Sequence, residues 1–407
     1  MVQRSADVAI IGGGLVGCFA AYFLRRRGQS VVVIERGAVC TAASGTNFGN
    51  LRLQGRHPAE FALALRAQAI WEELAALSGE GRAIRASGHL YLGLAVSDQP
   101  KLESIAQEAN AAGLAVDLLD GNAVRRRWPM VSDLITGACW SRRDGIAEPT
   151  RIGPTVARLA AAAGAQLIEN TRVTRMVPGA GGFTVSTDRD LSVSCGRLIN
   201  AAGAWGAELA GACGEPVPLF AAGPPLFEVH PEHAWDGPSL AAVDGTLLLR
   251  PGLTGPAVAG TFPRVKADLG SGRAPVPPER VGPALAHLNS VVPGLGRLRA
   301  GRVWSGVEGY LPDMLPVIGA SGTTPGLVHA FGFSGHGFQL APGVGAVLAE
   351  LVTTGVSETP IAAFALARFA DGAAVVDDKL WREFDPELVA RFRRGHAGTA
   401  DASRHDL

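Results

Sequence analysis

The chain has 407 residues, a formal net charge of +0 and 47% hydrophobic residues. This length is too great for one compact domain and suits two or three lobes with sizeable cores. The balanced charge gives no argument for binding nucleic acid or an anionic membrane surface. We find no run of about 18 uninterrupted apolar residues that would predict a membrane span, and we therefore expect a cytoplasmic protein.

The five cysteines are scattered and include no CxxC pair: Cys18, Cys40, Cys139, Cys195 and Cys213. Their odd number and their spacing predict neither a disulfide framework nor a zinc site. An iron–sulfur cluster needs about four clustered thiolates, so we expect this chain to carry no cluster and no other metal of its own.

Residues 7–35 predict a strand, a glycine turn, a helix and a second strand. The turn reads Gly12-Gly13-Gly14-Leu15-Val16-Gly17. In this pattern Gly12 makes a tight turn, Gly14 lets a pyrophosphate approach the backbone, and Gly17 lets the helix pack close to the strand. The helix N-terminus then offers N–H groups and a positive dipole end to phosphates. Because Glu35 ends the second strand, it can accept hydrogen bonds from a ribose, so the pattern predicts a dinucleotide site.

The following elements alternate between helices and strands. In chain order we expect a glycine-rich loop at 41–50, helices at 58–78, 100–112 and 154–163, strands at 88–94, 116–119, 166–168 and 198–205, and a hairpin at 173–187. The hairpin turn at 179–182 resembles a second nucleotide loop, but no helix follows it, so we predict a plain turn.

The amino-acid composition changes at about residue 216. Residues 216–300 are rich in proline and glycine, with strands at 247–250 and 257–260, which favours an antiparallel sheet in a second lobe. From residue 326 the pattern returns to strand (327–331), glycine turn (332–337) and helix (338–353). The charged stretch after residue 377 predicts a helical tail, with residues 395–407 disordered.

These elements predict an α/β fold in which a Rossmann-type domain is interleaved with an α+β substrate domain built on an antiparallel sheet. We assign residues 1–85, 145–215 and 301–370 to the nucleotide-binding domain, 86–144 and 216–300 to the substrate domain, and 371–407 to the tail. A nicotinamide-dependent dehydrogenase usually completes its nucleotide fold within about 150 contiguous residues. The discontinuous domain, with a late helix whose positive end can face a group that becomes negative on reduction, favours FAD instead.

Several motifs, in order over about residues 5–370, resemble the D-amino-acid oxidase family of FAD-dependent enzymes. They are IIGGGLVG with VIERG, the loop at 44–49, INAAGAWG, WSGVEGYLPDMLPVIG and HAFGFSGHGFQLAPGVG. The last two motifs are most similar to the FAD-bearing subunits of D-hydroxyproline dehydrogenase, opine oxidase and hydrogen cyanide synthase. The resemblance implies FAD as cofactor and iron–sulfur or flavin proteins as possible partner subunits.

The resemblance also implies which residues contact the cofactor. They are Gly12, Gly14, Leu15, Val16, Gly17, Glu35 and Arg36 near the adenosine and pyrophosphate, Ser44, Gly45, Thr46 and Asn47 along the diphosphate and flavin, Val173 at the adenine, Ala202 and Gly203 near the dinucleotide, and Gly335, His336, Gly337, Phe338 and Gln339 around the flavin ring.

The substrate contacts are less regular, and we identify no certain catalytic residue. Enzymes of this family commonly bind the substrate carboxylate with an arginine in the segment matched by 304–310, where this sequence has Glu308. Arg52 and Arg250 are the alternative arginines, and a structural ion pair is equally open for each. Glu308 would meet the substrate amine or an internal arginine. Tyr310 would line the pocket or only pack in the core, and His336 would bond the flavin or substrate or only shape its turn.

The resemblance implies oxidation of the C–N bond of a D- or N-substituted amino acid, with a D-hydroxyproline-like imino acid favoured and the electrons passed to a partner or quinone. Two alternatives remain. One is a glycine, sarcosine or D-amino-acid oxidase that uses O2. The other is an opine oxidase or assembly subunit that is inactive without its iron–sulfur partner.

Overall fold

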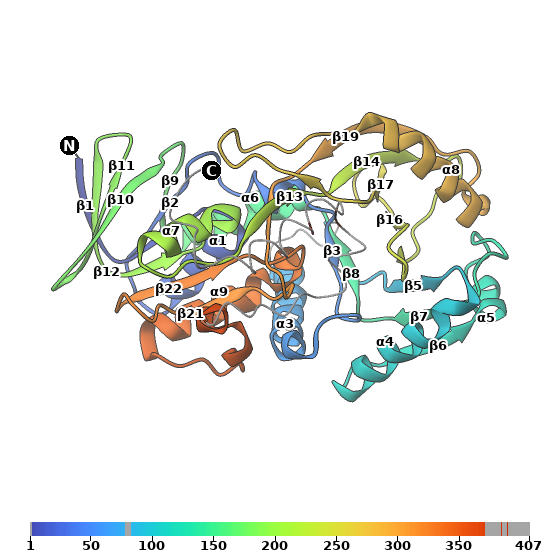
Figure 1. The fold of residues 1–407 in the computed structure, drawn as a ribbon, viewed down its shortest axis with the longest axis horizontal. Coiled ribbons are helices and arrows are strands. Elements are labelled where there is room, and N and C mark those ends of the chain that lie inside the picture. Colours follow the sequence, from blue (N-terminus) through green and yellow to red (C-terminus); the bar gives the residue numbers. More distant parts are fainter. Residues whose placement is uncertain (1, 78–82, 371–383, 385–388, 390–407) are drawn as a thin grey trace.

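The computed structural model describes residues 2–77, 83–370, 384 and 389. Two eight-stranded sheets lie toward opposite ends of the long axis, with helix α3 (Phe61–Leu77) and the short strands β3 (Asn50–Leu51) and β8 (Gly145–Ala147) between them (Figure 1). The helical tail expected over 371–407 falls almost wholly outside the described residues. No helix in the described ranges is long and apolar enough to cross a membrane.

The first sheet has the parallel order expected of a nucleotide-binding domain. Its parallel strands are, in spatial order, β9 (Gln166–Ile168), β2 (Val31–Ile34), β1 (Val2–Ile11), β12 (Leu191–Asn200) and β22 (Leu327–Phe331). Strand β21 (Val317–Ala320) adds an antiparallel edge beside β22, and the hairpin β10 (Val173–Gly179) and β11 (Gly182–Thr187) extends from β12. The predicted plain turn at 179–182 is therefore confirmed.

Both faces of this sheet are buried, which explains its continuous apolar strands. Alternate residues Val8 and Ile10 face one core with α1 (Leu15–Arg26), whereas Ala9 and Ile11 face the other core with β11 and β12. Helix α6 (Pro149–Ala162) packs on α1, and α7 (Gly206–Ala212) packs near β12 and β22.

The second sheet builds the other lobe and is antiparallel except where β15 pairs with β5. Its strands, in spatial order, are β19 (Arg299–Ser305), β14 (Pro225–His230), β17 (Ala257–Gly260), β16 (Leu248–Arg250), β15 (Ser239–Ala242), β5 (His89–Gly93), β7 (Gly137–Ser141) and β6 (Val116–Asp120). Helices α4 (Gln99–Ala111), α5 (Gly121–Arg127) and α8 (Val281–Val291) accompany it. The predicted α/β fold with a second, antiparallel lobe is confirmed. The predicted domain limits stay a prediction. The limit at residue 300 falls inside β19.

Two three-stranded sheets connect the lobes. In one of them, β8 pairs with β3 and with β4 (Ile84–Arg85). In the other, β13 (Phe220–Gly223) pairs with β18 (Val265–Lys266) and with β20 (Glu308–Tyr310). Strand β20 carries Glu308, so its pairing with β13 fixes the backbone that carries this carboxylate.

Helix α9 (Gly337–Thr354) lies against α1 and α3 and is buried over most of its length. Two glycines allow this close approach. A Cβ on Gly345 would come within 2.5 Å of Phe19 Cβ, and a Cβ on Gly343 would come within 2.9 Å of Leu63 O. Any larger side chain at these positions would push α9 away from the two helices.

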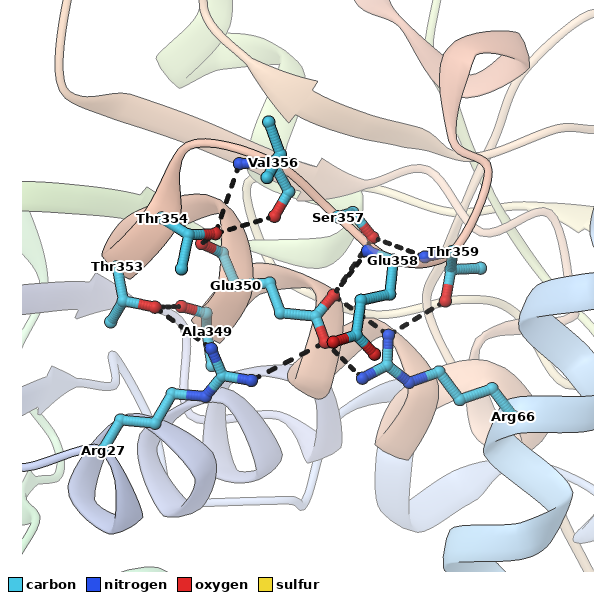
Figure 2. A network of polar contacts seen from close by, with 10 residues as sticks. All are labelled: Arg27, Arg66, Ala349, Glu350, Thr353, Thr354, Val356, Ser357, Glu358 and Thr359. Carbon is cyan, nitrogen blue, oxygen red and sulfur yellow. Dashed lines mark hydrogen bonds and ion pairs between the residues drawn. The ribbon is translucent and has the colours of Figure 1, made fainter.

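Near the C-terminal end of α9, the buried carboxylate of Glu350 gathers partners from three segments (Figure 2). Both guanidinium nitrogens of Arg66 donate to it, and Arg27 Nη2 lies 3.6 Å from Oε1. The Ser357 hydroxyl and the Glu358 backbone N–H add hydrogen bonds of 3.2 Å each. Burial alone would raise the pKa of Glu350, but the hydrogen bonds from Arg66 and the Glu358 N–H outweigh it and hold the pKa below its ordinary value.

We predict that Glu350→Gln lowers the free energy of unfolding by roughly 1.5–3 kcal/mol, because hydrogen bonds to a charged partner are lost. Since a lowered carboxyl pKa stabilises the fold only while the group is ionised, this deficit should shrink as the pH falls through the carboxyl range. Urea unfolding at pH 7 and at pH 4 measures both effects. Glu358→Gln, which changes an exposed side chain in the same loop, is the matched control.

Candidate active site

A cavity of about 800 Å³ runs along the carboxyl ends of the parallel strands. Its wall includes Ile11, Ile34, Ala201 and Gly332, which end or directly follow four of these strands. Ligands of open α/β sheets bind at this edge, and the volume is in the range of small-molecule sites.

The glycine turn at the start of α1 forms one wall of the cavity. Gly12 has φ +109°, and a Cβ there would lie 2.3 Å from Ala201 O. A Cβ on Gly17 would lie 2.0 Å from Gly12 O, so this glycine lets α1 pack against the turn. A Cβ on Gly14 would meet only Ser44 Oγ, at 3.2 Å, so the backbone at Gly14 stays open to a ligand in the cavity.

Two side chains stiffen this wall. Glu35 accepts hydrogen bonds from the backbone N–H groups of Gly13 (2.7 Å) and Gly37 (2.8 Å). A carboxylate has about four acceptor positions, so Glu35 keeps capacity for a ribose hydroxyl. Ser44, in the short helix α2 (Ala43–Thr46), accepts from the Leu15 N–H at 2.9 Å and so closes the first turn of α1.

The loop after α2 is held by its own side chains. The Asn47 amide donates to the carbonyls of Ala43 and Ser44, and its oxygen accepts from the Gly49 N–H. The Trp304 indole donates to Thr46 O at 2.9 Å, which ties this loop to β19 of the second lobe. The loop therefore has a fixed shape where it borders the cavity.

At the end of the cavity near Glu35, a cation lies on an aromatic ring. The Arg36 guanidinium carbon is 4.1 Å from the centre of the Trp205 ring. The Trp205 indole donates to Leu269 O, and the neighbouring Ser271 and Gly272 also line the cavity. A flat, charged platform of this kind suits an adenine ring.

At the other end of the cavity, the turn at 332–335 lies beside β20. The Ser334 N–H donates to Gly309 O, and Ser334 Oγ accepts from the Leu311 N–H. The Glu308 carboxylate accepts a hydrogen bond from the Tyr310 hydroxyl and lines the cavity, whereas the Tyr310 ring is fully buried. An acidic group is thus fixed at the flavin end that the sequence predicts.

Helix α9 begins at this end, and its first residues, Gly337 and Phe338, line the cavity. Its positive dipole end therefore faces the ligand space. The two neighbouring side chains turn away: His336 contacts Glu60, and Gln339 donates to Ala64 O at 2.9 Å.

The structure gathers most of the predicted site residues around one cavity. Those on its wall are Gly12, Gly14, Leu15, Val16, Glu35, Arg36, Ser44, Asn47, Val173, Ala202, Gly203, Glu308, Gly335, Gly337 and Phe338. Those behind the wall or away from it are Gly17, Gly45, Thr46, Arg52, Arg250, Tyr310, His336 and Gln339.

The two candidate arginines differ in their surroundings. Arg250 is buried, and its guanidinium contacts the carbonyls of Phe48 and Pro251 and the Glu148 carboxylate, which favours the structural alternative. Arg52 instead reaches the start of α9, where its Nη2 lies 3.4 Å from His336 Nε2.

The family model "FAD dependent oxidoreductase" matches residues 7–351. The chain belongs to this FAD-dependent oxidoreductase family. It is 28% identical to monomeric sarcosine oxidase of Streptomyces avermitilis, covering 90% of this chain and 99% of that protein. It is 27% identical to 4-methylaminobutanoate oxidase (formaldehyde-forming) of Paenarthrobacter nicotinovorans, covering 89% of this chain and 45% of that longer protein. Glycine oxidase of Geobacillus kaustophilus shares the fold, with a TM-score of 0.83, 24% identity and coverage of 90% of this chain and 99% of that one.

FAD is the cofactor of this family, and the cavity fits it. The open backbone at Gly14 and the helix start at Leu15 suit the pyrophosphate, Glu35 suits the ribose, and the Arg36–Trp205 platform suits the adenine. The start of α9 suits the flavin ring, because its positive end would stabilise charge gained on reduction.

Sequence reasoning did not identify two groups at the site. Trp205 stands in the INAAGAWG motif, but only its contact with Arg36 shows what its ring does. Arg264 stands in no motif. Its Nη2 lies 3.4 Å from the position that a Cβ would take on Gly335, and Glu308 Oε2 lies 3.9 Å from the same point. A cation and an acid thus flank the glycine that borders the flavin end.

We predict that Gly14→Val weakens FAD binding about 100-fold, or about 2.8 kcal/mol, because the added side chain would occupy the pyrophosphate position. Gly14 has an extended backbone (φ −71°), so a valine meets no backbone strain there. Titration of apoprotein with FAD, followed by flavin fluorescence, measures the change. Gly211→Ala, at a helix position where a Cβ meets nothing within 4 Å, should bind FAD like wild type.

The carboxylate of Asp144, near Arg52, is fully buried. Asp144 Oδ1 accepts from the Ser141 hydroxyl (2.7 Å) and from the Leu53 N–H (3.0 Å). Burial raises the pKa of Asp144 to about 6, although these hydrogen bonds oppose the shift. The folded chain therefore keeps this proton up to about pH 6, whereas the unfolded chain releases it near its ordinary pKa of 3.8.

Because the folded state binds the proton more tightly, Asp144 makes the free energy of unfolding fall as the pH rises from about 4 to about 6. The Asp144→Asn variant lacks this dependence. We therefore expect the variant to gain stability relative to wild type between pH 4 and pH 6, with no further gain above pH 7. Urea unfolding of both proteins across this range measures the difference, and a constant difference would contradict the assignment.

Proposed function

We propose that this enzyme oxidises the C–N bond of an N-substituted amino acid, a secondary amine that also carries a carboxylate. The observation that carries the proposal is the Glu308 carboxylate on the cavity wall beside the start of α9. Two relatives act, by their names, on sarcosine and on 4-methylaminobutanoate, both N-methyl amino acids. A cyclic imino acid such as D-hydroxyproline has the same two groups and belongs to the same proposal.

In this proposal, Glu308 holds the substrate nitrogen. Its Oε2 accepts from the Tyr310 hydroxyl, and strand pairing of β20 with β13 fixes the backbone that carries it. A carboxylate suits an N–H donor such as an amine, because it accepts several hydrogen bonds and those with a charged partner are strong. The amine would then lie next to Gly335, at the flavin end of the cavity.

The substrate carboxylate needs a cation close to this point. A guanidinium matches a carboxylate with two parallel N–H groups. Of the arginines in this region, Arg52 adjoins His336, which lies between the cavity-lining Gly335 and Gly337. We assign the carboxylate to Arg52, with Arg264 placed to balance the charge of Glu308.

Bound FAD supplies the two-electron acceptor for a hydride from the carbon next to the nitrogen. The protein orients that carbon by holding the nitrogen at Glu308 and the carboxylate at Arg52. The oxidised C=N bond then takes up water and breaks into a carbonyl compound and an amine, or remains as a cyclic imine. The electrons leave to a quinone or to a partner subunit in the leading form of the proposal, and to O2 in the alternative.

An anaerobic mixing experiment tests the substrate class. We expect sarcosine, D-hydroxyproline or another N-substituted amino acid to bleach the flavin absorbance faster than primary D-amino acids do. Glu308→Gln should lower kcat/KM for that substrate roughly 10- to 100-fold, because a charged hydrogen bond is lost. Glu358→Gln is the control.

Bleaching by primary amino acids alone would contradict the proposal. Comparison of a dye acceptor with dissolved oxygen then separates dehydrogenase from oxidase, since fast peroxide production would overturn the dehydrogenase form. A yellow protein that no amine bleaches until a partner is added would indicate the assembly-subunit alternative.

A further inference from the structure

A series of polar contacts links the short 3₁₀ turn Pro58–Glu60 to Arg52. It passes through His336, directly before α9. The Glu60 side chain is fully buried, and its Oε1 and Oε2 lie 3.1 and 2.9 Å from His336 Nδ1. On the other side of the ring, His336 Nε2 lies 3.4 Å from Arg52 Nη2. Of the residues in this series of contacts, only His336 was also predicted to contact the cofactor.

The chemistry of the three groups fixes the proton on the histidine. An arginine only donates hydrogen bonds, so His336 Nε2 must accept from Arg52. The ring proton is therefore on Nδ1 and points at the Glu60 carboxylate. A carboxylate beside an imidazole N–H determines both the tautomer and the ring orientation, so Glu60 decides which nitrogen faces Arg52.

A second arginine, Arg56, contacts both Glu60 and the backbone of Arg52. Arg56 Nη1 lies 3.6 Å from Glu60 Oε2, and Arg56 Nη2 donates to Gln339 Oε1 at 2.9 Å. Arg56 Nε donates to the backbone carbonyl of Arg52 at 2.8 Å. The backbone of Arg52 and the carboxylate of Glu60 are thus fixed by one buried side chain.

The Arg52 side chain is held by three acceptors. Its Nη1 donates to the carbonyls of Gln54 and Gly55, and its Nη2 contacts His336. Among the residues that the structure describes, these contacts leave Nε–H and one N–H of Nη2 for a ligand. The guanidinium is planar, so fixing Nη1 and Nη2 also fixes the direction of that remaining edge.

We propose that Glu60 is a positioning residue that, through His336, directs the Arg52 guanidinium toward the substrate carboxylate. This inference rests on the proposed function, because it takes the ligand of Arg52 to be a carboxylate. Glu60 itself does not touch the substrate. Its removal therefore affects ligands that carry a carboxylate and spares those that lack one.

The test uses the FAD-loaded enzyme and two probes that differ in charge, benzoate and benzamide, with binding followed by the flavin absorbance spectrum. Glu60→Leu should weaken benzoate binding about tenfold or more, which corresponds to about 1.4 kcal/mol, and leave benzamide binding unchanged. Glu60→Gln keeps an acceptor for Nδ1–H and should recover most of the benzoate affinity. In an Arg52→Met background, Glu60→Leu should cause no further loss, because the two residues act on one contact.

An equal loss for benzoate and benzamide would show a structural role and overturn the proposal, as would unchanged benzoate binding in Glu60→Leu. If Glu60→Leu does not fold, His336→Leu removes the same acceptor for Arg52 and should cause the same selective loss. The titration needs no turnover. An enzyme that oxidises no N-substituted amino acid would therefore refute the proposed function, whereas the benzoate titration still decides the role of Glu60.

Discussion

Helix α9 is held near both ends by buried charged groups, and the positions of the cofactor and substrate residues depend on this arrangement. Toward its C-terminal end, Glu350 joins Arg27, which directly follows α1, and Arg66 of α3. At its N-terminal end, His336 meets Glu60, the residue directly before α3. Between these anchors, glycines bring the α9 backbone against α1 and α3. Since α1 and α9 both begin at the cavity wall, their packing sets the two ends of the cavity relative to each other.

The chemistry of the cavity follows from which groups this packing leaves exposed to a ligand. The dinucleotide end offers backbone N–H groups, Glu35 and an Arg36–Trp205 platform. The flavin end offers a helix N-terminus and Glu308, while Arg52 stands behind the wall at the first residues of α9. Buried charges cost free energy unless they are paired, and the buried carboxylates of Glu350 and Glu60 both have partners from other segments of the chain. The site is therefore preorganised by the fold, as catalysis by orientation and electrostatics requires.

Much of this fold could be predicted from the sequence, because glycine turns and apolar periodicity are local signals. The first strand–helix–strand unit, the hairpin at 173–187 and the final strand, turn and helix were all found at close to their observed positions. The helix at 281–291 was missed, because the prolines and glycines around it suggested a sheet region.

The site was harder to predict where contacts join distant segments. Nothing local marks Glu60 as the partner of a histidine 276 residues away, or Arg264 as the neighbour of Gly335. The same limit applies to Gln339, whose motif indicates the flavin but whose side chain packs against α3.

The central claim is that the flavin end of the cavity binds a substrate by its nitrogen and its carboxylate together. A crystal structure of the FAD-loaded enzyme with a bound, non-reactive N-substituted amino acid tests it most directly. The account predicts the ligand nitrogen within hydrogen-bond distance of Glu308 and the ligand carboxylate on the Nε–Nη2 edge of Arg52. A carboxylate bound instead at Arg264 or Arg250, or a nitrogen remote from Glu308, would contradict it.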